Sequence, residues 1–394
     1  MPVGKGPILL CSTADWDNPF WTNKQHMAVQ FALHGYQVLY VDSLGLRRPT
    51  LASCDLGRIF RRLVRAVPVP RQVRPNIWRV SPVVIPLHGV TALRRLNDCL
   101  LIATLRWHLS LLGFGAPLIW SYNPLLHDVI RHLPHRGVVY HCVDDLRTAP
   151  GLPGEVIEDA ERRFGHMADL CFTTSPSLQR RMTPLFRGTH YEGNVCDVDH
   201  FRRAREHPPE PEDLAVIPHP RLLFVGALSR YKVDFSLMES VAQQIPQAHW
   251  VLVGAVGEGQ PGSAGPPTHL ANVHYFGPRP YAALPDYLGH ADVAVLPAPK
   301  NEYTASMFPM KFFEYLAAGL PVVASSLPAL EEYRDLFFPA DGPTAFAQAV
   351  RAVLEGARRD RKRIDAACTY HSWSARFLRM EKFFSPLLES SHHA

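Results

Sequence analysis

The chain has 394 residues, of which 47% are hydrophobic and 20% are charged. At about 150 residues per domain this length predicts two or three packed units, and the composition excludes the disordered and collagen-like classes. The net charge of +5 is concentrated in one segment, because residues 47–79 hold nine Arg and one Asp and the rest of the chain sums to −3. We therefore expect a globular protein with a single basic patch.

Seven cysteines are spread along the chain without a Cys-x-x-Cys pair. This pattern favours buried free thiols in a reducing compartment over disulfides or a metal site. The apolar stretch near the N-terminus is too short for a signal peptide. The longest apolar stretch, residues 100–120, is interrupted by Arg106 and His108, whereas a spanning helix needs roughly 18 uninterrupted apolar residues. We expect a cytoplasmic protein without a transmembrane segment.

The first half of the chain alternates short apolar runs with helical patterns. Strands are predicted at residues 7–13, 36–42, 116–122, 137–144 and 169–175. A helix is predicted over residues 21–34, ended by Gly35. Such alternation is typical of a parallel sheet with crossover helices, in which ligands bind at the carboxyl ends of the strands.

A second series of strands follows the proline-rich residues 207–220, which we expect to form a linker or a surface loop. Its strands are predicted at residues 221–228, 249–256, 272–277, 291–297 and 320–325, and its helices at 233–244 and 310–318. The predicted domains are residues 1–200, a linker at 201–220, and residues 221–373. Residues 374–394 form an amphipathic helix and tail that we expect to pack back on the first domain. The fold class predicted is α/β, with two Rossmann-like domains facing a cleft.

Three phrases carry a family resemblance: YEGNVCDVDHF at residues 191–201, VGALSRYK at 225–232 and FPMKFFEYLAAGLPVVAS at 308–325. In this order they resemble the GT-B glycosyltransferases of the large group 1 family, whose members use nucleotide-sugar donors. The resemblance follows the whole chain but is sharp only from Tyr191 to Ser326. It implies that the second domain binds the donor and the first binds the acceptor.

The third phrase predicts a diphosphate site. Pro309 opens a helix, so free backbone N–H groups and the positive helix end face Ser306 and the residues after it. The Lys311 ammonium can neutralise a departing diphosphate, and Glu314, one turn further on, can accept both hydroxyls of a ribose. The resemblance implies the same two roles. A helix-start lysine beside a solvated glutamate is the structural alternative.

Further donor contacts are predicted in the loops that follow two strands. Gly226 lets the backbone approach a ligand, and Lys232, rather than Arg230, is our candidate for a phosphate contact, as the resemblance implies for a basic residue in this loop. Gly254 closes the next strand. Arg279 is our candidate to stack on the base. Simple exposure is the alternative for Lys232 and Arg279.

One feature departs from the retaining members of this family, which carry a Glu-x7-Glu pair. Counting back from Glu314 places Ser306 where the first glutamate belongs. Glu302 lies four residues earlier and could take that place through loop length. The departure favours inversion at the anomeric carbon.

The predicted base lies in the first domain. VYHCVDDL runs from a buried strand into a loop that holds Asp144 and Asp145, and a carboxylate there can take a proton from an acceptor hydroxyl. The phrase also resembles VYRASDGL of the xanthan-type glucuronosyltransferases, which implies that Asp144 is the base of an inverting reaction. The alternative is that the paired aspartates cap the following segment.

Acceptor contacts are predicted at Asp15, Asn23 and His26, in or after a loop rich in Trp, Asp and Asn. Equally, Thr22 or Asn23 is a helix N-cap and Gln25 or His26 is merely exposed.

We expect no metal and no cofactor. Asp197 and Asp199 form an Asp-x-Asp that falls in the hinge phrase, away from the predicted phosphate site, and we interpret it as structural. The resemblance implies that helix dipole and cations carry the charge without a metal.

The basic patch contains an amphipathic helical pattern. Residues 56–67 place apolar side chains at helical spacing opposite Arg58, Arg61, Arg62 and Arg65. Such a helix can lie on an anionic membrane, or it can pack on the core with a solvated arginine face. RNA binding is disfavoured because no aromatic side chains interleave with the arginines.

These patterns predict a cytoplasmic glycosyltransferase, peripheral at the inner face of the cell membrane, that moves a sugar from a nucleoside diphosphate to a hydroxyl of a glycan, lipid-linked or small-molecule acceptor. The alternatives are a non-hydrolysing sugar-nucleotide epimerase of the same fold and a nucleotide-sugar-binding partner without turnover.

Overall fold

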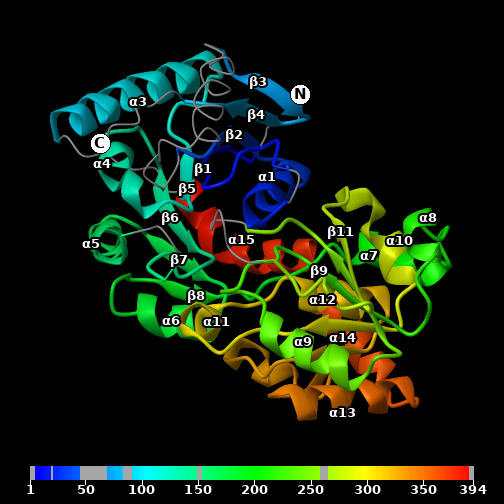
Figure 1. Cartoon of the computed structure of the whole chain (residues 1–394). Coiled ribbons are helices and arrows are strands. Elements are labelled where there is room, and N and C mark those ends of the chain that lie inside the picture. The colour runs from blue at the N-terminus through cyan, green and yellow to red at the C-terminus, as the bar shows by residue number, and fades with distance from the viewer. Residues whose placement is uncertain are drawn as a thin grey trace. The chain divides into compact units, whose positions relative to one another are not determined.

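The computed structural model describes residues 5–18, 21–44, 69–82, 91–148, 153–257 and 265–389. They fall into two compact units, each built on its own sheet (Figure 1). The first unit comprises Met1–Thr174, Leu178–Glu192 and Phe377–Ala394, and the second comprises Ser175–Ser177 and Gly193–Arg376.

The sheet of the first unit has the order β3-β4-β2-β1-β5-β6-β7-β8, and all of its neighbouring strands are parallel except the pair β3 and β4. Its strands are β1 Pro7–Cys11, β2 Gln37–Val41, β3 Arg71–Arg74, β4 Ile77–Val80, β5 Leu118–Ser121, β6 Gly137–Cys142, β7 Leu170–Thr173 and β8 Thr189–Tyr191. The central strands β5 and β6 are buried along their whole length, as expected for parallel strands covered on both faces.

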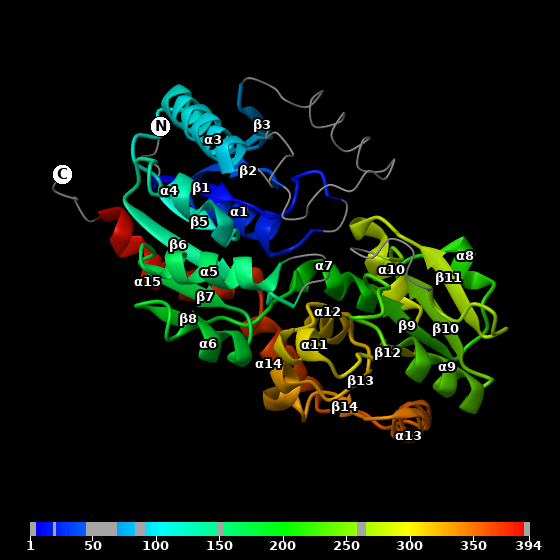
Figure 2. The same cartoon turned by 60° about the vertical axis from the view of Figure 1, so that its left-hand side comes forward.

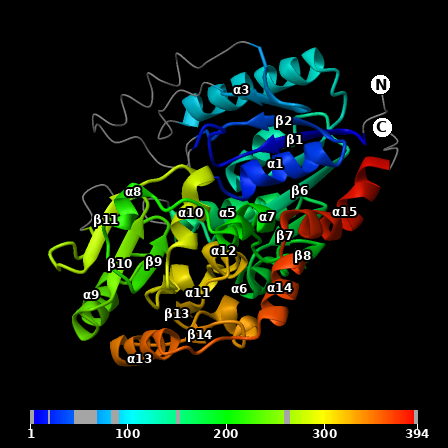
Figure 3. The ribbon, with the colours of Figure 1, turned by 90° about the vertical axis from the view of Figure 1, so that its right-hand side faces the viewer.

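Helices on both faces cover this sheet. They are α1 Asn23–Leu33, α3 Thr91–Leu111, α4 His127–Ile130, α5 Gly154–Gly165, α6 Pro176–Met182 and α15 Trp373–Glu389. Helix α15 runs beside α1 (Figure 3), where the rings of Phe377 and Phe384 contact Phe31 at 5.2 and 5.4 Å between ring centres. Phe384 also contacts Trp120 of β5 at 5.5 Å. The last helix therefore belongs to the core of the first unit.

The second sheet is parallel throughout, in the order β11-β10-β9-β12-β13-β14. Its strands are β9 Arg221–Val225, β10 His249–Val253, β11 Val273–Gly277, β12 Val293–Leu296, β13 Val322–Ala324 and β14 Phe338–Pro339. The chain builds outward from β9 in one direction, then returns to build from β12 in the other. The strand order therefore reverses between β9 and β12, which is where doubly wound sheets bind their ligands.

The helices of the second unit are α7 Val198–Arg202, α8 Glu212–Ala215, α9 Phe235–Gln244, α10 Leu284–Gly289, α11 Glu302–Ser306, α12 Lys311–Ala318, α13 Pro343–Leu354 and α14 Arg361–Tyr370. Helices α9 and α13 pack against each other (Figure 2), and α12 packs against α7 and α14. Helix α12 is buried along almost its entire length.

The predicted fold class is confirmed in both sheets. One local prediction is wrong: the proline-rich residues 207–220 are not devoid of regular structure, because α8 lies among them. Pro211 occupies the N-cap position of α8, where the N–H that proline lacks would have no helical partner. The structure also contains β3, β4, α3, β8 and β14, which the sequence patterns did not predict.

The boundary between the two units lies earlier than the predicted domain boundary. Residues 193–220, which the predicted boundaries divide between the first domain and a linker, belong to the second unit. Five of the described cysteines are buried as expected, but Cys99 on α3 is exposed, so burial was the wrong expectation for that thiol.

Candidate functional site

Two glycines end neighbouring strands of the second sheet. Gly226 follows β9 and Gly254 follows β10, and their φ angles are +156° and +148°. A Cβ atom on Gly254 would lie 1.8 Å from the carbonyl oxygen of Gly226. Only glycine therefore fits at position 254, and the two strand ends run closer together than side chains would permit.

The first turn of α12 carries the two predicted donor-binding side chains. The Nζ atom of Lys311 donates a hydrogen bond to Oε2 of Glu314 at 2.7 Å, and the Glu314 side chain is only 5% exposed. Burial raises the pKa of Glu314 above its usual value, although the Lys311 charge opposes that shift. The lysine thus compensates a carboxylate that the fold holds away from water, which is not the solvated glutamate of the structural alternative.

Ser306 lies at the end of α11, just before this turn. It is buried, and its hydroxyl is 3.2 Å from the hydroxyl of Ser177 in the same unit. Asn194 donates from Nδ2 to the carbonyl oxygen of Phe308 at 2.7 Å, which ties down the segment between α11 and α12. Glu302, the alternative first glutamate, is exposed in the first turn of α11.

Lys232 lies over two aromatic rings in the loop that follows β9. Its Nζ atom is 5.3 Å from the ring centre of Tyr231 and 5.8 Å from that of Tyr303. Asn301 ties the two segments together by donating to the Tyr231 carbonyl oxygen at 3.0 Å. The loop is therefore anchored to the N-terminus of α11, and the ammonium of Lys232 is placed by cation–π contacts. Arg230, its alternative, is exposed.

Arg279 is held in a polar cluster after β11. Its guanidinium bonds to Asp213 of α8, to the Tyr287 hydroxyl at 2.8 Å and to the Phe276 carbonyl oxygen. The hydrogen bond that Arg279 donates to Asp213 raises the pKa of Arg279, although partial burial acts against it. This is a structural ion pair rather than a simply exposed side chain. Stacking of Arg279 on a base stays a prediction.

In the first unit, Asp144 lies two residues beyond the end of β6, with its side chain 40% exposed. The ammonium of Lys24, from the first turn of α1, lies 4.0 Å from Oδ2 of Asp144 and 5.5 Å from the ring centre of Tyr122. The Lys24 side chain is only 10% exposed. The Lys24 cation therefore lies beside the carboxylate that the sequence predicts as the general base, and 40% exposure leaves that carboxylate accessible to a hydroxyl.

The neighbouring Asp145 has a different environment. It is buried and bonds to Arg147 at Nε and Nη2, and Arg181 of α6 lies close to the same carboxylate. Burial alone would raise the pKa of Asp145, but the two arginines lower it below its usual value. Arg181 also pairs with Glu161 of α5. Asp145 therefore anchors the loop, and Asp144 presents the less buried carboxylate.

The three predicted acceptor residues lie in the first turn of α1 or next to it. Asn23 and His26 belong to it, and the Asp15 carbonyl oxygen accepts a hydrogen bond from Gln25 at 3.0 Å. Thr22 is the N-cap, in a capping box with Gln25, as one alternative predicted. The expectation that Gln25 or His26 is merely exposed is wrong, because both residues are buried and the His26 ring lies 5.4 Å from the Trp21 ring between ring centres.

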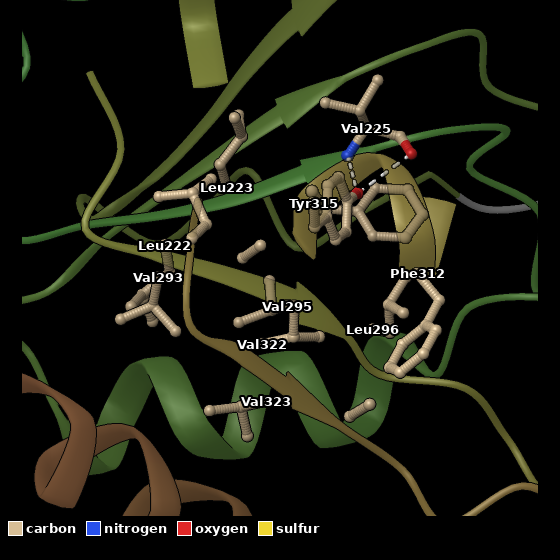
Figure 4. Close-up of a cluster of buried hydrophobic side chains, with 14 of the residues drawn as sticks. Leu222, Leu223, Val225, Val293, Val295, Leu296, Phe312, Tyr315, Val322 and Val323 are labelled. Carbon is tan, nitrogen blue, oxygen red and sulfur yellow. Dashed lines mark hydrogen bonds between the residues drawn. The ribbon is translucent and has the colours of Figure 1, made fainter. Parts of the chain in front are cut away.

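Sequence reasoning missed two residues. Lys24 could have been noticed because a cation in the first turn of a helix opposes the helix dipole, so another feature must hold it there. Tyr315 gave no sequence signal, since an aromatic side chain in a helix is normally core. Its hydroxyl bonds to both backbone groups of Val225, the last residue of β9 (Figure 4).

The remaining predictions concern metals and membranes. Asp197 is the N-cap of α7 and accepts from the His200 N–H at 3.2 Å, consistent with a structural role for the Asp-x-Asp. Among the described residues, no group of three or more His, Cys, Asp or Glu is arranged to hold a metal ion. None of the helices in that part of the chain is long and apolar enough to cross a membrane. The basic segment at residues 56–67 lies outside the described residues.

Comparison with known proteins supports this description. The model of the family "Glycosyl transferases group 1" matches residues 219–356. A relative from Bacillus subtilis (strain 168), named "Putative teichuronic acid biosynthesis glycosyltransferase TuaH", is 29% identical over 234 residues. That alignment covers 55% of this chain and 58% of TuaH, so the chain spans little more than half of this relative's length.

Two solved structures share the fold. Sucrose-phosphate synthase from Thermosynechococcus elongatus superposes with a TM-score of 0.69 at 19% identity, covering 98% of this chain and 100% of that one. Anabaena HepE, in a complex with UDP and glucose, superposes with a TM-score of 0.64 at 14% identity, covering 96% and 99%. Residues 219–356 therefore match the glycosyl transferases group 1 family model, and the two sheets have the GT-B fold.

Proposed function

We propose that this protein is a glycosyltransferase that moves a sugar from a nucleoside-diphosphate sugar to a hydroxyl of a glycan, lipid-linked or small-molecule acceptor in polysaccharide or glycoconjugate biosynthesis. The observation that carries the proposal is the ion pair at the start of α12 between the partly exposed Lys311 and the buried Glu314. The name of TuaH and the UDP bound to HepE agree with a sugar-nucleotide donor and a role in polysaccharide synthesis.

In this proposal the donor replaces the Lys311–Glu314 ion pair. The diphosphate takes the Lys311 ammonium, and the two ribose hydroxyls donate to the Glu314 carboxylate. Negative charge grows on the leaving diphosphate as the glycosidic bond breaks, so Lys311 stabilises the transition state more than the ground state. Glu314 contacts a part of the donor that does not react and contributes equally to both states.

The test compares Lys311→Ala and Glu314→Ala. We expect Lys311→Ala to lower turnover about 100-fold, more than it weakens donor binding, and Glu314→Ala mainly to weaken binding. Lys300→Ala is the matched control, because Lys300 forms an exposed pair with Asp341 at 2.8 Å in the same unit. Wild-type rates in both variants would remove this site from consideration.

Two experiments separate the alternatives. A thermal-shift screen over UDP, GDP, ADP and TDP identifies the base, because ligand at about 100 times its Kd adds about 2.7 kcal/mol of stability. Incubation with donor alone distinguishes transfer from epimerisation: a transferase gives slow hydrolysis, whereas an epimerase gives a new sugar nucleotide. A protein that binds the donor without either reaction would be the non-catalytic partner.

We further propose that the protein works at an anionic membrane surface. Besides the arginine-rich residues 56–67, the supporting observation is a second apolar stripe on α3. Leu96, Leu100, Trp107 and Leu111 are each 45–52% exposed and recur at helical spacing. They lie on a different side of the helix from Leu101, Leu105 and Leu109, which are buried in the core.

Charge favours a lipid surface as the partner of this stripe. Among residues 95–111 of α3, whose side chains the structure describes, the exposed charged residues are Arg95 and Arg106, and the carboxylate of Asp98 is half-buried. A second copy would bring arginines towards arginines, whereas anionic lipid headgroups complement them.

The test is co-sedimentation with phosphatidylglycerol vesicles at low salt, with phosphatidylcholine vesicles as reference. We expect wild-type binding to anionic vesicles, lost in the Leu100→Gln/Trp107→Gln variant and in the variant with Gln at positions 58, 61, 62 and 65. Leu33→Gln, at another exposed leucine of the same unit, should bind normally. Wild-type protein that ignores anionic vesicles, or a dimer that the Leu100→Gln/Trp107→Gln change dissociates, would contradict the proposal.

A further inference from the structure

At its carboxyl end, strand β9 still pairs with β10 but no longer pairs with β12. On one side the pairing with β10 continues to Val225, opposite Val253, and the Gly226 N–H still donates to the Val253 carbonyl oxygen at 2.9 Å. On the other side the pairing with β12 includes only Leu222 and Leu223. The N–H and C=O of Val225 point to this second side, because the backbone groups of successive residues in a strand form hydrogen bonds on opposite sides of the strand.

A side chain of α12 takes the place of the missing strand. The Tyr315 hydroxyl accepts from the Val225 N–H at 2.7 Å and donates to the Val225 carbonyl oxygen at 3.2 Å (Figure 4). Tyr315 is completely buried. One hydroxyl thereby satisfies both backbone groups of a buried strand end, which would otherwise lose their hydrogen bonds.

This contact joins the two elements that carry the predicted donor site. Val225 immediately precedes Gly226, and Tyr315 immediately follows Glu314. The contact lies between β9 and β12, where the strand order reverses. We infer that Tyr315 is a positioning residue, which sets the distance between the Gly226 loop and the Lys311–Glu314 turn. This inference rests on the proposed function.

The test is Tyr315→Phe, which keeps the ring and removes only the hydroxyl. Calorimetry with UDP, GDP, ADP and TDP on the full chain, well below the melting temperature, should show about 10-fold weaker binding of the nucleotide that wild type prefers. In the Glu314→Ala background the same change should weaken binding less than about 2-fold, because the geometry that it disturbs acts on binding through Glu314.

Tyr333→Phe is the matched control. It removes another buried tyrosine hydroxyl in the same unit, bonded to His371 at 3.0 Å, from a ring that also contacts α12. It should bind nucleotide as wild type does. Equal losses in the two variants, or an equal effect of Tyr315→Phe with and without the Glu314 carboxylate, would reduce Tyr315 to a packing residue and overturn the inference.

Hydrogen exchange provides a readout that needs no ligand. The peptide that contains Gly226 should exchange faster in Tyr315→Phe than in Tyr333→Phe, and equal rates would overturn the inference. Wild-type protein that binds none of the four nucleotides would instead refute the proposed function, so the two failures are distinguishable.

Discussion

Two adjacent aspartates illustrate how environment separates side chains of the same type. Asp145 is enclosed by Arg147 and Arg181, whereas Asp144 keeps 40% of its side chain exposed, with Lys24 at 4.0 Å. A carboxylate fixed by two guanidinium groups is a poor proton acceptor. Sequence reasoning selected Asp144 over Asp145 from a family resemblance, and the surroundings of the two side chains give an independent physical reason for the same choice.

The prediction at this scale concerns Asp144→Asn, which keeps shape and polarity but cannot take a proton. We expect turnover to fall about 100-fold or more while donor binding stays near normal, with inversion at the anomeric carbon. Proton NMR of the first product gives its configuration. Asp159→Asn is the control, because Asp159 is a carboxylate of similar exposure, 49%, in the same unit. A product with the configuration of the donor, or near-normal turnover of Asp144→Asn, would contradict the inverting assignment.

At the scale of elements, the close approach of the carboxyl ends of β9 and β10 depends on one glycine. Gly254→Ala would place a Cβ atom 1.8 Å from the Gly226 carbonyl oxygen, at a φ of +148° that side chains rarely adopt. We expect a loss of at least about 2 kcal/mol in the free energy of unfolding, measured by thermal and denaturant unfolding. Gly115→Ala should change little, because no atom lies within 4 Å of its Cβ position. Equal stabilities of these two variants would refute the argument.

The sequence predicted the central elements and missed the peripheral ones. Strands such as β5 and β6 are buried on both faces, so their residues form apolar runs that are readable without context. Strand β3 reads Arg-Gln-Val-Arg and is mostly exposed, so its conformation comes from pairing with β4 rather than from its own residues. Candidate site residues divide in the same way. Lys311 and Glu314 could be proposed as donor-binding residues because they lie within one helix turn. The contacts of Lys24 with Asp144 and of Tyr315 with Val225 join segments far apart in sequence, so only the tertiary structure reveals them.

At the scale of the whole molecule, the chain begins and ends in the same unit. Residues from Phe377 onward belong to the first unit, and Glu192 and Arg379, 187 positions apart in sequence, form an ion pair of 2.8 Å within it. The core of that unit is therefore completed only when the last helix has been made. The first 192 residues alone would leave Phe31 and Trp120 without their aromatic partners Phe377 and Phe384.

The last prediction follows from this connection. Phe384→Ala removes a fully buried ring that contacts Phe31, Tyr36 and Trp120, which should cost about 3–5 kcal/mol. Hydrogen exchange should accelerate in peptides of β1, α1 and β5 and stay unchanged in peptides of β9, β10 and β12, because the ring belongs to the first unit alone. Leu378→Ala, on the same helix but 48% exposed, should leave both sets unchanged. Faster exchange in the second set as well would show that α15 stabilises the two sheets as one cooperative structure, whereas unchanged exchange in the first set would show that its core is complete without the ring.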